Sequence, residues 1–213
     1  MESVVTPELQ PLLNRLDEAA TAEQVRFAVE DIAAAQLVES VPILIKVLGY
    51  NNPGAAVAAV DGLIQLGEPA VMPLIELLDG FNYGARAWAL RSLAGIGDPR
   101  GMDLVVKASL EDFALSVRRA AARGVGTLRW ELFPEPELAA AQKRAIDTLI
   151  QVCEDPEWVV RYAAITGLES LLQAIGEGSE WRSQLVQRLE IAVSKDETLA
   201  VRARARLALE RRG

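Results

Sequence analysis

The chain has 213 residues, 51% of them apolar and 33 of them alanine, so it can bury a core and its composition favours helix. It contains no histidine and one cysteine, Cys153, which excludes histidine-based catalytic triads, histidine metal sites and an internal disulfide. The formal net charge of −8 argues against the binding of nucleic acid through a basic groove.

One pattern recurs six times along the chain and predicts six amphipathic helices. The copies begin at Val25, Ala55, Ala85, Val117, Val160 and Val201, at intervals of 30, 30, 32, 43 and 41 residues. The residues four and eight places after each start are apolar in every copy, so they extend it into one helical stripe that a core can bury. The second residue is arginine in five copies: Arg26, Arg86, Arg118, Arg161 and Arg202. We expect these arginines to form salt bridges and caps between neighbouring repeats.

A second apolar run precedes each copy and predicts a partner helix. These runs cover residues 9–16, 41–48, 71–78, 102–108, 145–153 and 185–193. A hairpin of two such helices cannot bury its apolar face alone, so the hairpins must stack on one another. The sequence therefore predicts an all-α solenoid of about six helical hairpins, with residues 1–213 forming a single repeat domain. The two longest intervals contain insertions, at residues 128–138 and 173–182, which we expect to be loops or helix extensions at the rim.

Two stretches of the chain carry a family resemblance. They are Asn-Tyr-Gly-Ala-Arg-Ala at residues 82–87 and Asp-Phe-Ala-Leu-Ser-Val-Arg-Arg-Ala at residues 112–120. With the repeats around them, they resemble the HEAT-like repeats of cyanobacterial phycobilin lyases. Over nearly the whole chain, the resemblance is to the smaller subunit of the heterodimeric E/F-type phycocyanobilin lyases.

This resemblance implies an activity and two protein partners. It implies a lyase that attaches, and can detach, phycocyanobilin at a cysteine of the phycocyanin alpha subunit through a thioether bond. The bilin is then a transferred ligand and not a tightly bound cofactor, and a larger HEAT-like subunit is the partner. Related isomerising lyases carry a His-Cys motif, which a chain without histidine cannot contain, so attachment without isomerisation is implied. A non-catalytic scaffold or adaptor in phycobilisome assembly or degradation is the alternative.

Candidate ligand residues follow from the chemistry of an open-chain tetrapyrrole. Arginines suit its two propionates, a carboxylate suits its pyrrole N–H groups, and aromatic rings pack on its flat surface. In such solenoids the second helices line the concave face. On that basis the ligand candidates are Asp61, Tyr83, Trp88, Arg91, Arg119, Arg123 and Tyr162. Ordinary solvated surface remains the alternative for the arginines, and core packing for Trp88. No residue is singled out as catalytic, and no set of metal ligands is found.

The remaining unusual residues have two interpretations each. Trp130, Phe133, Trp158 and Trp181 lie in or near the insertions, where they either pack under a loop or contact a protein partner. Of these, Trp130, Phe133 and Trp181 are the candidates for partner contact. Cys153 falls on an apolar helix face and is expected to be a small buried residue, with a transient thiol adduct of the bilin as the alternative. No apolar run is long enough to span a bilayer and residues 1–5 show no signal sequence, so we expect a cytoplasmic protein that binds no nucleic acid.

Overall fold

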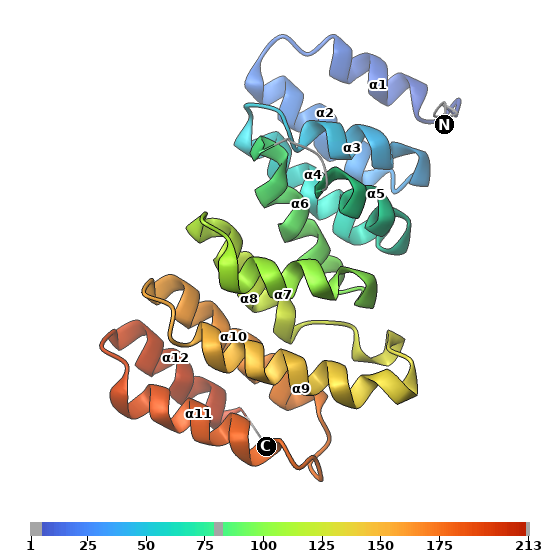
Figure 1. Ribbon diagram of the computed structural model, residues 1–213. Helices are drawn as coiled ribbons and strands as arrows, with labels where there is room; N and C mark the ends of the chain where they lie inside the picture. Colours follow the sequence, from blue (N-terminus) through green and yellow to red (C-terminus); the bar gives the residue numbers. More distant parts are fainter. Residues whose placement is uncertain (1–5, 79–82, 212–213) are drawn as a thin grey trace. The chain divides into compact units, whose positions relative to one another are not determined.

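The computed structural model describes residues 6–78 and 83–211, with the backbone alone at residues 83 and 84. Within these ranges it contains α-helices and short 3-10 helices and no β-strand, which confirms the all-α prediction (Figure 1). The chain divides after Ile96 into two compact units. Each unit contains three helical hairpins stacked in chain order, so the prediction of about six hairpins is confirmed.

The first unit consists of the hairpins α1–α2, α3–α4 and α5–α6. Its helices are α1 (Gln10–Asp17), α2 (Ala22–Ala34), α3 (Val41–Val47), α4 (Pro53–Leu66), α5 (Glu68–Leu78) and α6 (Tyr83–Ile96). Helix α2 begins with a capping box, in which the Thr21 hydroxyl accepts from the Gln24 backbone N–H and the Gln24 side chain accepts from the Thr21 N–H. Helix α4 is capped at its start by Asn52, whose side chain accepts from the Ala55 N–H, and at its end by Gly67 with φ 69°.

Second helices pack on one another in the first unit through small residues. Helix α2 packs on α4, and α4 packs on α6. A Cβ atom placed on Gly62 of α4 would lie 2.7 Å from the Cβ atom of Ala33 in α2. The two backbones therefore approach closely because neither position carries a larger side chain.

The second unit consists of the hairpins α7–α8, α9–α10 and α11–α12. Its helices are α7 (Met102–Glu111), α8 (Leu115–Gly126), α9 (Glu135–Val152), α10 (Trp158–Ala174), α11 (Arg182–Lys195) and α12 (Leu199–Glu210). Here α8 packs on α10, and α10 packs on α12. The crossing of α8 and α10 is very close, because a Cβ atom on Gly126 would lie 2.1 Å from the carbonyl oxygen of Gly167.

An aspartate–arginine ladder joins the hairpins of the second unit. Arg118 of α8 donates from Nε to Asp155 at 2.8 Å, and Arg161 of α10 donates from Nε to Asp196 at 2.9 Å. Each aspartate lies between the two helices of the following hairpin and accepts the backbone N–H two residues later, at 2.8 Å. The predicted salt bridges between repeats are therefore present at Arg118 and Arg161. Arg26, in contrast, pairs with Glu30 inside α2.

The first insertion lengthens a helix, whereas the second is mainly a loop, at residues 175–181. Helix α9 begins at Glu135, ten residues before the predicted start, since Pro136 lies in the first turn, where a missing backbone N–H breaks no helical bond. The short 3-10 helix Trp130–Leu132 precedes it. Helix α10 extends to Ala174 before a turn leads to α11. None of the helices within residues 6–78 and 83–211 is both long enough and apolar enough to cross a bilayer.

Candidate functional site

In the first unit, Trp88 and Arg91 form a paired surface on α6. The Arg91 guanidinium carbon lies 5.7 Å from the centroid of the Trp88 ring, within reach of a cation–π interaction. Arg91 is exposed and Trp88 is half-buried, so the ring is neither core nor fully solvated. Asp61 is exposed on the neighbouring helix α4. The side chain of Tyr83 lies outside the described residues, as does Asn82.

In the second unit, Arg119 and Arg123 are exposed one turn apart on α8. Within residues 6–78 and 83–211, neither guanidinium has a carboxylate partner, in contrast to the ladder arginines. Tyr162 of α10 occupies the repeat position of Arg119 and is 38% exposed. The unit thus presents two free cations and a phenol ring on helices that pack side by side. Such a surface can bind a planar dianion.

Three large apolar residues continue the same surface. Sequence reasoning missed two of them, Leu115 and Leu199, and assigned Trp158 to loop packing or partner contact. Leu115, Trp158 and Leu199 each follow a loop aspartate by three residues and open the second helix of their hairpin. They are 40%, 46% and 71% exposed. Each lies one turn before the position of Arg119 or its equivalent, so the side chains share a helical stripe. The regular spacing from Asp112, Asp155 and Asp196 was the available signal. We call Leu115, Arg119, Arg123, Trp158, Tyr162 and Leu199 the second-helix face.

The aromatic residues of the insertions are mainly packed into the fold. Trp130 is buried, at 8% exposure, and its ring stacks on Phe133 with the centroids 5.3 Å apart. Its indole nitrogen has no hydrogen-bond partner among the described residues. Phe133 and Trp181 are half-buried. The packing interpretation fits the placement of Trp130, and contact of Phe133 or Trp181 with a partner stays a prediction.

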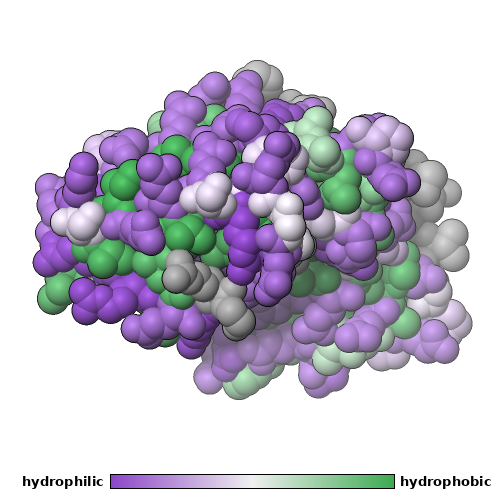
Figure 2. Space-filling model, turned by 90° about the horizontal axis from the view of Figure 1, so that it is seen from below, coloured by the Kyte–Doolittle hydropathy of each residue, from purple (hydrophilic) through white to green (hydrophobic). Residues whose placement is uncertain are grey.

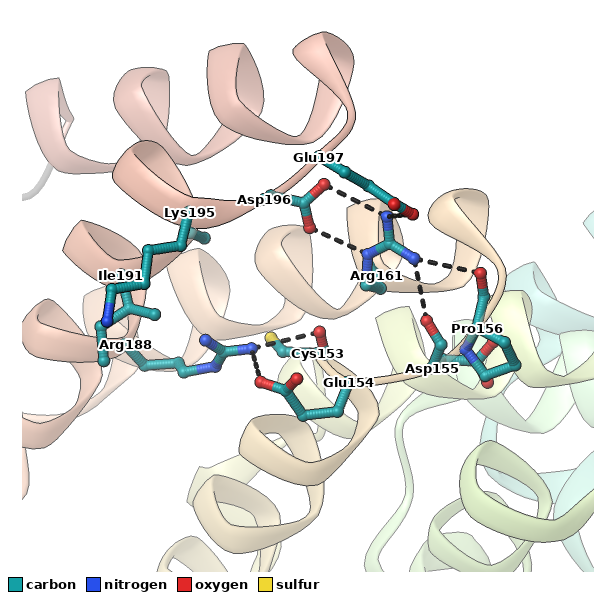
Figure 3. A pocket seen from close by; sticks show the side chains of 11 residues that line it. Cys153, Glu154, Asp155, Pro156, Arg161, Arg188, Ile191, Lys195, Asp196 and Glu197 are labelled. Atoms are coloured by element: carbon teal, nitrogen blue, oxygen red, sulfur yellow. Dashed lines mark hydrogen bonds and ion pairs between the residues drawn. The ribbon is translucent and has the colours of Figure 1, made fainter.

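A cleft of about 400 Å³ lies where the loop between α9 and α10 meets α11 and the loop before α12 (Figure 3). Ion pairs occupy its walls. Arg161 pairs with Asp196, while Arg188 of α11 donates to the Glu154 carboxylate at 2.5 Å and to the Cys153 carbonyl oxygen at 3.1 Å. Most of its charged side chains are already in ion pairs, although Lys195 has none among the described residues, so the cleft is mainly a seam between hairpins.

Cys153 lines this cleft but its thiol is not poised to react. The side chain is 3% exposed, and this burial is the main reason why its pKa rises to about 11. The thiol is therefore protonated at neutral pH, and the thiolate is the nucleophilic form. This placement supports the interpretation of Cys153 as a small buried residue. In the described part of the chain, no three acidic or cysteine side chains lie close enough together to hold a metal ion.

Comparison with known proteins gives a consistent result. The model of the PBS lyase HEAT-like repeat matches residues 85–111 and 117–155, and that of the HEAT repeat matches residues 145–175. The chain is 52% identical to the phycocyanin alpha phycocyanobilin lyase CpcF of Synechocystis sp., over 99% of this chain and 97% of that protein. It is 48% identical to the phycocyanobilin lyase subunit beta of Pseudanabaena tenuis, over 97% of this chain and 74% of that protein.

A solved structure shows the same architecture. It is that of the complex of CpcE and CpcF of phycocyanin lyase from Nostoc sp. PCC7120. The matched chain superposes with a TM-score of 0.74 at 45% sequence identity, covering 81% of this chain and 99% of that one.

Proposed function

The chain belongs to the family of CpcF-type phycocyanobilin lyase subunits, and from this premise we propose that it is one subunit of a lyase for the phycocyanin alpha subunit. The lyase joins phycocyanobilin to a cysteine of that protein through a thioether bond, and can reverse the reaction. The bilin is its transferred substrate. The activity belongs to a heterodimer with a larger HEAT-like subunit, as the CpcE–CpcF complex of the Nostoc relative suggests.

The observation that carries this proposal is the pair of free arginines on α8. A guanidinium pairs with a carboxylate through two parallel hydrogen bonds, and Arg119 and Arg123 are exposed, adjacent and without a described partner. A bilin has two propionates, so one substrate can engage both residues. Trp158 and Tyr162 on α10 offer rings on which conjugated pyrroles can pack. Trp88 and Arg91 offer the same combination of ring and cation in the first unit.

The chemistry demands little catalytic machinery from this chain. Thioether formation is an addition, in which the acceptor S–H bond and one C=C π bond of the bilin break while C–S and C–H bonds form. Beyond the bilin and the acceptor cysteine it needs no oxidant and no further reactant. Holding the bilin carboxylates fixed beside the acceptor cysteine makes the reaction effectively intramolecular, which is a large part of what an enzyme can contribute. The absence of histidine supports simple addition without isomerisation.

Bilin transfer by the co-expressed heterodimer tests this proposal. Each lost charged pair at the bilin carboxylates costs about 1.5–3 kcal/mol, so the double variant Arg119→Gln/Arg123→Gln should transfer bilin to apo-phycocyanin at least about tenfold more slowly. The matched control is Lys107→Gln, an exposed cation on α7 with no described ion pair. Absorption spectra and acid-stable attachment report the product. Unchanged transfer in the double variant would contradict the assigned site, and absence of transfer by the wild-type heterodimer would favour the scaffold function.

A companion variant tests the contribution of the first unit. Arg91→Gln removes the cation above Trp88, and we expect a smaller loss of transfer, since one arginine is removed instead of two. If Arg91→Gln has no effect while the double variant does, the bilin carboxylates are bound by the second unit alone.

A further inference from the structure

The ladder arginines of the second unit hold their guanidinium groups in one repeated geometry. Nη1 of Arg118 donates to the carbonyl oxygens of Asp112 and Phe113, at 2.9 and 3.4 Å. Nη1 of Arg161 donates to the equivalent carbonyl oxygens of Asp155 and Pro156, at 3.0 and 3.1 Å. These bonds fix each guanidinium so that Nε and Nη2 point towards the aspartate of the following hairpin.

Arg202 of α12 repeats this geometry but has no aspartate to bind. Its Nη1 donates to the carbonyl oxygens of Asp196 and Glu197, at 2.8 and 3.0 Å. Within residues 6–78 and 83–211, no carboxylate accepts a hydrogen bond from its Nε or Nη2. In Arg161 the same two nitrogens bind Asp196 at 2.9 and 3.2 Å. The ladder therefore ends in an arginine that is already oriented to bind a carboxylate.

A second charged position is open on the same helix. Glu169 of α10 follows Arg161 by eight residues and pairs with the buried Arg204 of α12, which belongs to the following hairpin. Glu210 follows Arg202 by the same eight residues, is exposed, and has no cation partner among the described residues. Helix α12 thus presents an open cation and an open anion in the arrangement that α10 uses to bind α12.

Apolar surface accompanies these two charges. Leu199 is 71% exposed. Leu115 holds the same repeat position two hairpins earlier, where another hairpin follows, and it is 40% exposed. Leu207 of α12 is also exposed. Figure 2 views the molecule from below and shows apolar residues in green among polar ones on that side. Surfaces of this kind are typical of a partner-binding site.

We propose that α12 docks a helical hairpin of the larger HEAT-like subunit, stacked as the next repeat. This inference rests on the heterodimer in the proposed function and names where its two chains meet. The docked hairpin supplies an aspartate to Arg202 and an arginine to Glu210. The contact of α10 with the last hairpin predicts the spacing of this aspartate and arginine. There Arg161 binds Asp196 and Glu169 binds Arg204, eight residues after Asp196. The partner should therefore carry an aspartate between two helices and an arginine eight residues later.

A second copy of this chain does not fit the same surface. If a second copy stacked as the next repeat, its first hairpin would have to supply the aspartate for Arg202 and the arginine for Glu210. They would come from the positions equivalent to Asp196 and Arg204. Those positions are Ala20 and Ala28, which carry no charge. The charge pattern of α12 therefore favours a different protein over self-association.

The experiment is to measure the dissociation constant of the two purified subunits without bilin. Truncating one member of a buried charged pair at an interface costs at least about 2 kcal/mol, so Arg202→Gln and Glu210→Gln should each weaken association about tenfold or more. Lys107→Gln is the matched control and should leave association unchanged. Glu210 is exposed and makes no described bond, so Glu210→Gln keeps the measurement interpretable if Arg202→Gln loosens α12.

Charge exchange identifies the contact. Arg202→Asp should abolish association, and replacement of the partner's loop aspartate by arginine should restore it in part. Dissociation constants within twofold of wild type for both Arg202→Gln and Glu210→Gln would overturn the proposal. So would concentration-dependent self-association of the chain alone that Arg202→Gln abolishes, since a second copy would then be the occupant. Loss of bilin transfer with unchanged association would count against the docking site and leave the proposed lyase function standing.

Discussion

Both units bring second helices together through small residues, and the second unit adds charged pairs between its hairpins. Between α2 and α4 in the first unit, Gly62 lies against Ala33, and the Asn52 amide donates to the Ala22 carbonyl oxygen at 2.8 Å, so the contact is made by small and neutral groups. In the second unit, arginines bind aspartates across each hairpin boundary, with side chains that are 8–14% exposed. The first kind of contact depends on side-chain volume. The second depends on charge, and it leaves an unsatisfied arginine at the last hairpin.

This difference explains why the second unit carries the more specific surfaces. Contacts between small residues leave no charged group open, whereas each ladder arginine calls for a carboxylate. Among the described residues, Arg202 has the ladder geometry and no carboxylate partner. The ladder also spaces the hairpins so that Leu115, Trp158 and Leu199 open their helices at equivalent points, which produces the second-helix face.

The largest effect should come from removing a ladder arginine. Arg161→Ala leaves Asp196 buried without its partner, and breaking such a pair costs about 3–5 kcal/mol. Arg26→Ala in the first unit removes a half-exposed pair within one helix and should cost at most about 1 kcal/mol. Urea unfolding of both variants measures the difference. Equal losses would show that the two units do not differ in the way described.

A slightly smaller effect should follow from Gly126→Ala. The new Cβ atom would lie 2.1 Å from the Gly167 carbonyl oxygen, and a backbone atom cannot rotate away, so we expect a loss of about 2–3 kcal/mol. In the first unit, Gly95→Ala places a Cβ atom 2.3 Å from Cδ1 of Ile64, a flexible side chain that can change rotamer. That variant should lose about 1 kcal/mol or less. Thermal unfolding gives both values, and a larger loss for Gly95→Ala would reverse the order.

Acid should weaken the ladder before the contacts between small residues. Burial works to raise the pKa of Asp196, but hydrogen bonds from Arg161 and the Thr198 N–H outweigh it and hold the pKa below its ordinary value of 3.8. Because the pKa of Asp196 is lower in the folded state, its ionised form stabilises the fold above pH 3.8. This stabilisation is lost as the pH falls through the pKa of the folded state. The stabilities of wild type and Asp196→Asn should therefore converge below that pH. Asp61→Asn, an exposed carboxyl of the first unit, should parallel the wild type throughout.

The smallest effect on activity should come from Cys153. Its buried thiol, with a pKa of about 11, should react slowly with a disulfide reagent at pH 7.5 and rapidly in urea. Cys153→Ala should lower the free energy of unfolding by about 1–2 kcal/mol through lost packing and leave bilin transfer by the heterodimer unchanged. A loss of transfer in a folded Cys153→Ala variant would revive the thiol adduct.

Local periodicity made much of the fold predictable. An apolar stripe with the period of a helix needs only a few neighbouring residues to be recognised, and six copies of it predicted six hairpins. The same alignment predicted salt bridges between repeats at all five repeated arginines. They are present at Arg118 and Arg161, whereas Arg26 pairs inside its own helix. The boundaries of α9 were missed, because the Pro136 that seemed to interrupt a helix sits in its first turn.

The candidate site was only partly predictable, because exposure depends on which helices lie alongside. Trp130 and Trp158 are chemically alike in the sequence, yet Trp130 is buried under the insertion and Trp158 is 46% exposed on α10. Likewise, Leu115 and Leu199 hold one repeat position, and their exposures differ according to whether a hairpin follows.

The sequence by itself determined the helical repeats and the family, since both depend on residue identity at fixed spacing. The tertiary structure alone decided which arginines are paired and which are free. Arg118, Arg119 and Arg123 are one residue type within six positions of α8, but a helix turns about 100° per residue, so they face different surroundings. Arg118 meets the aspartate of the next hairpin, while Arg119 and Arg123 face outward, where a substrate can reach them.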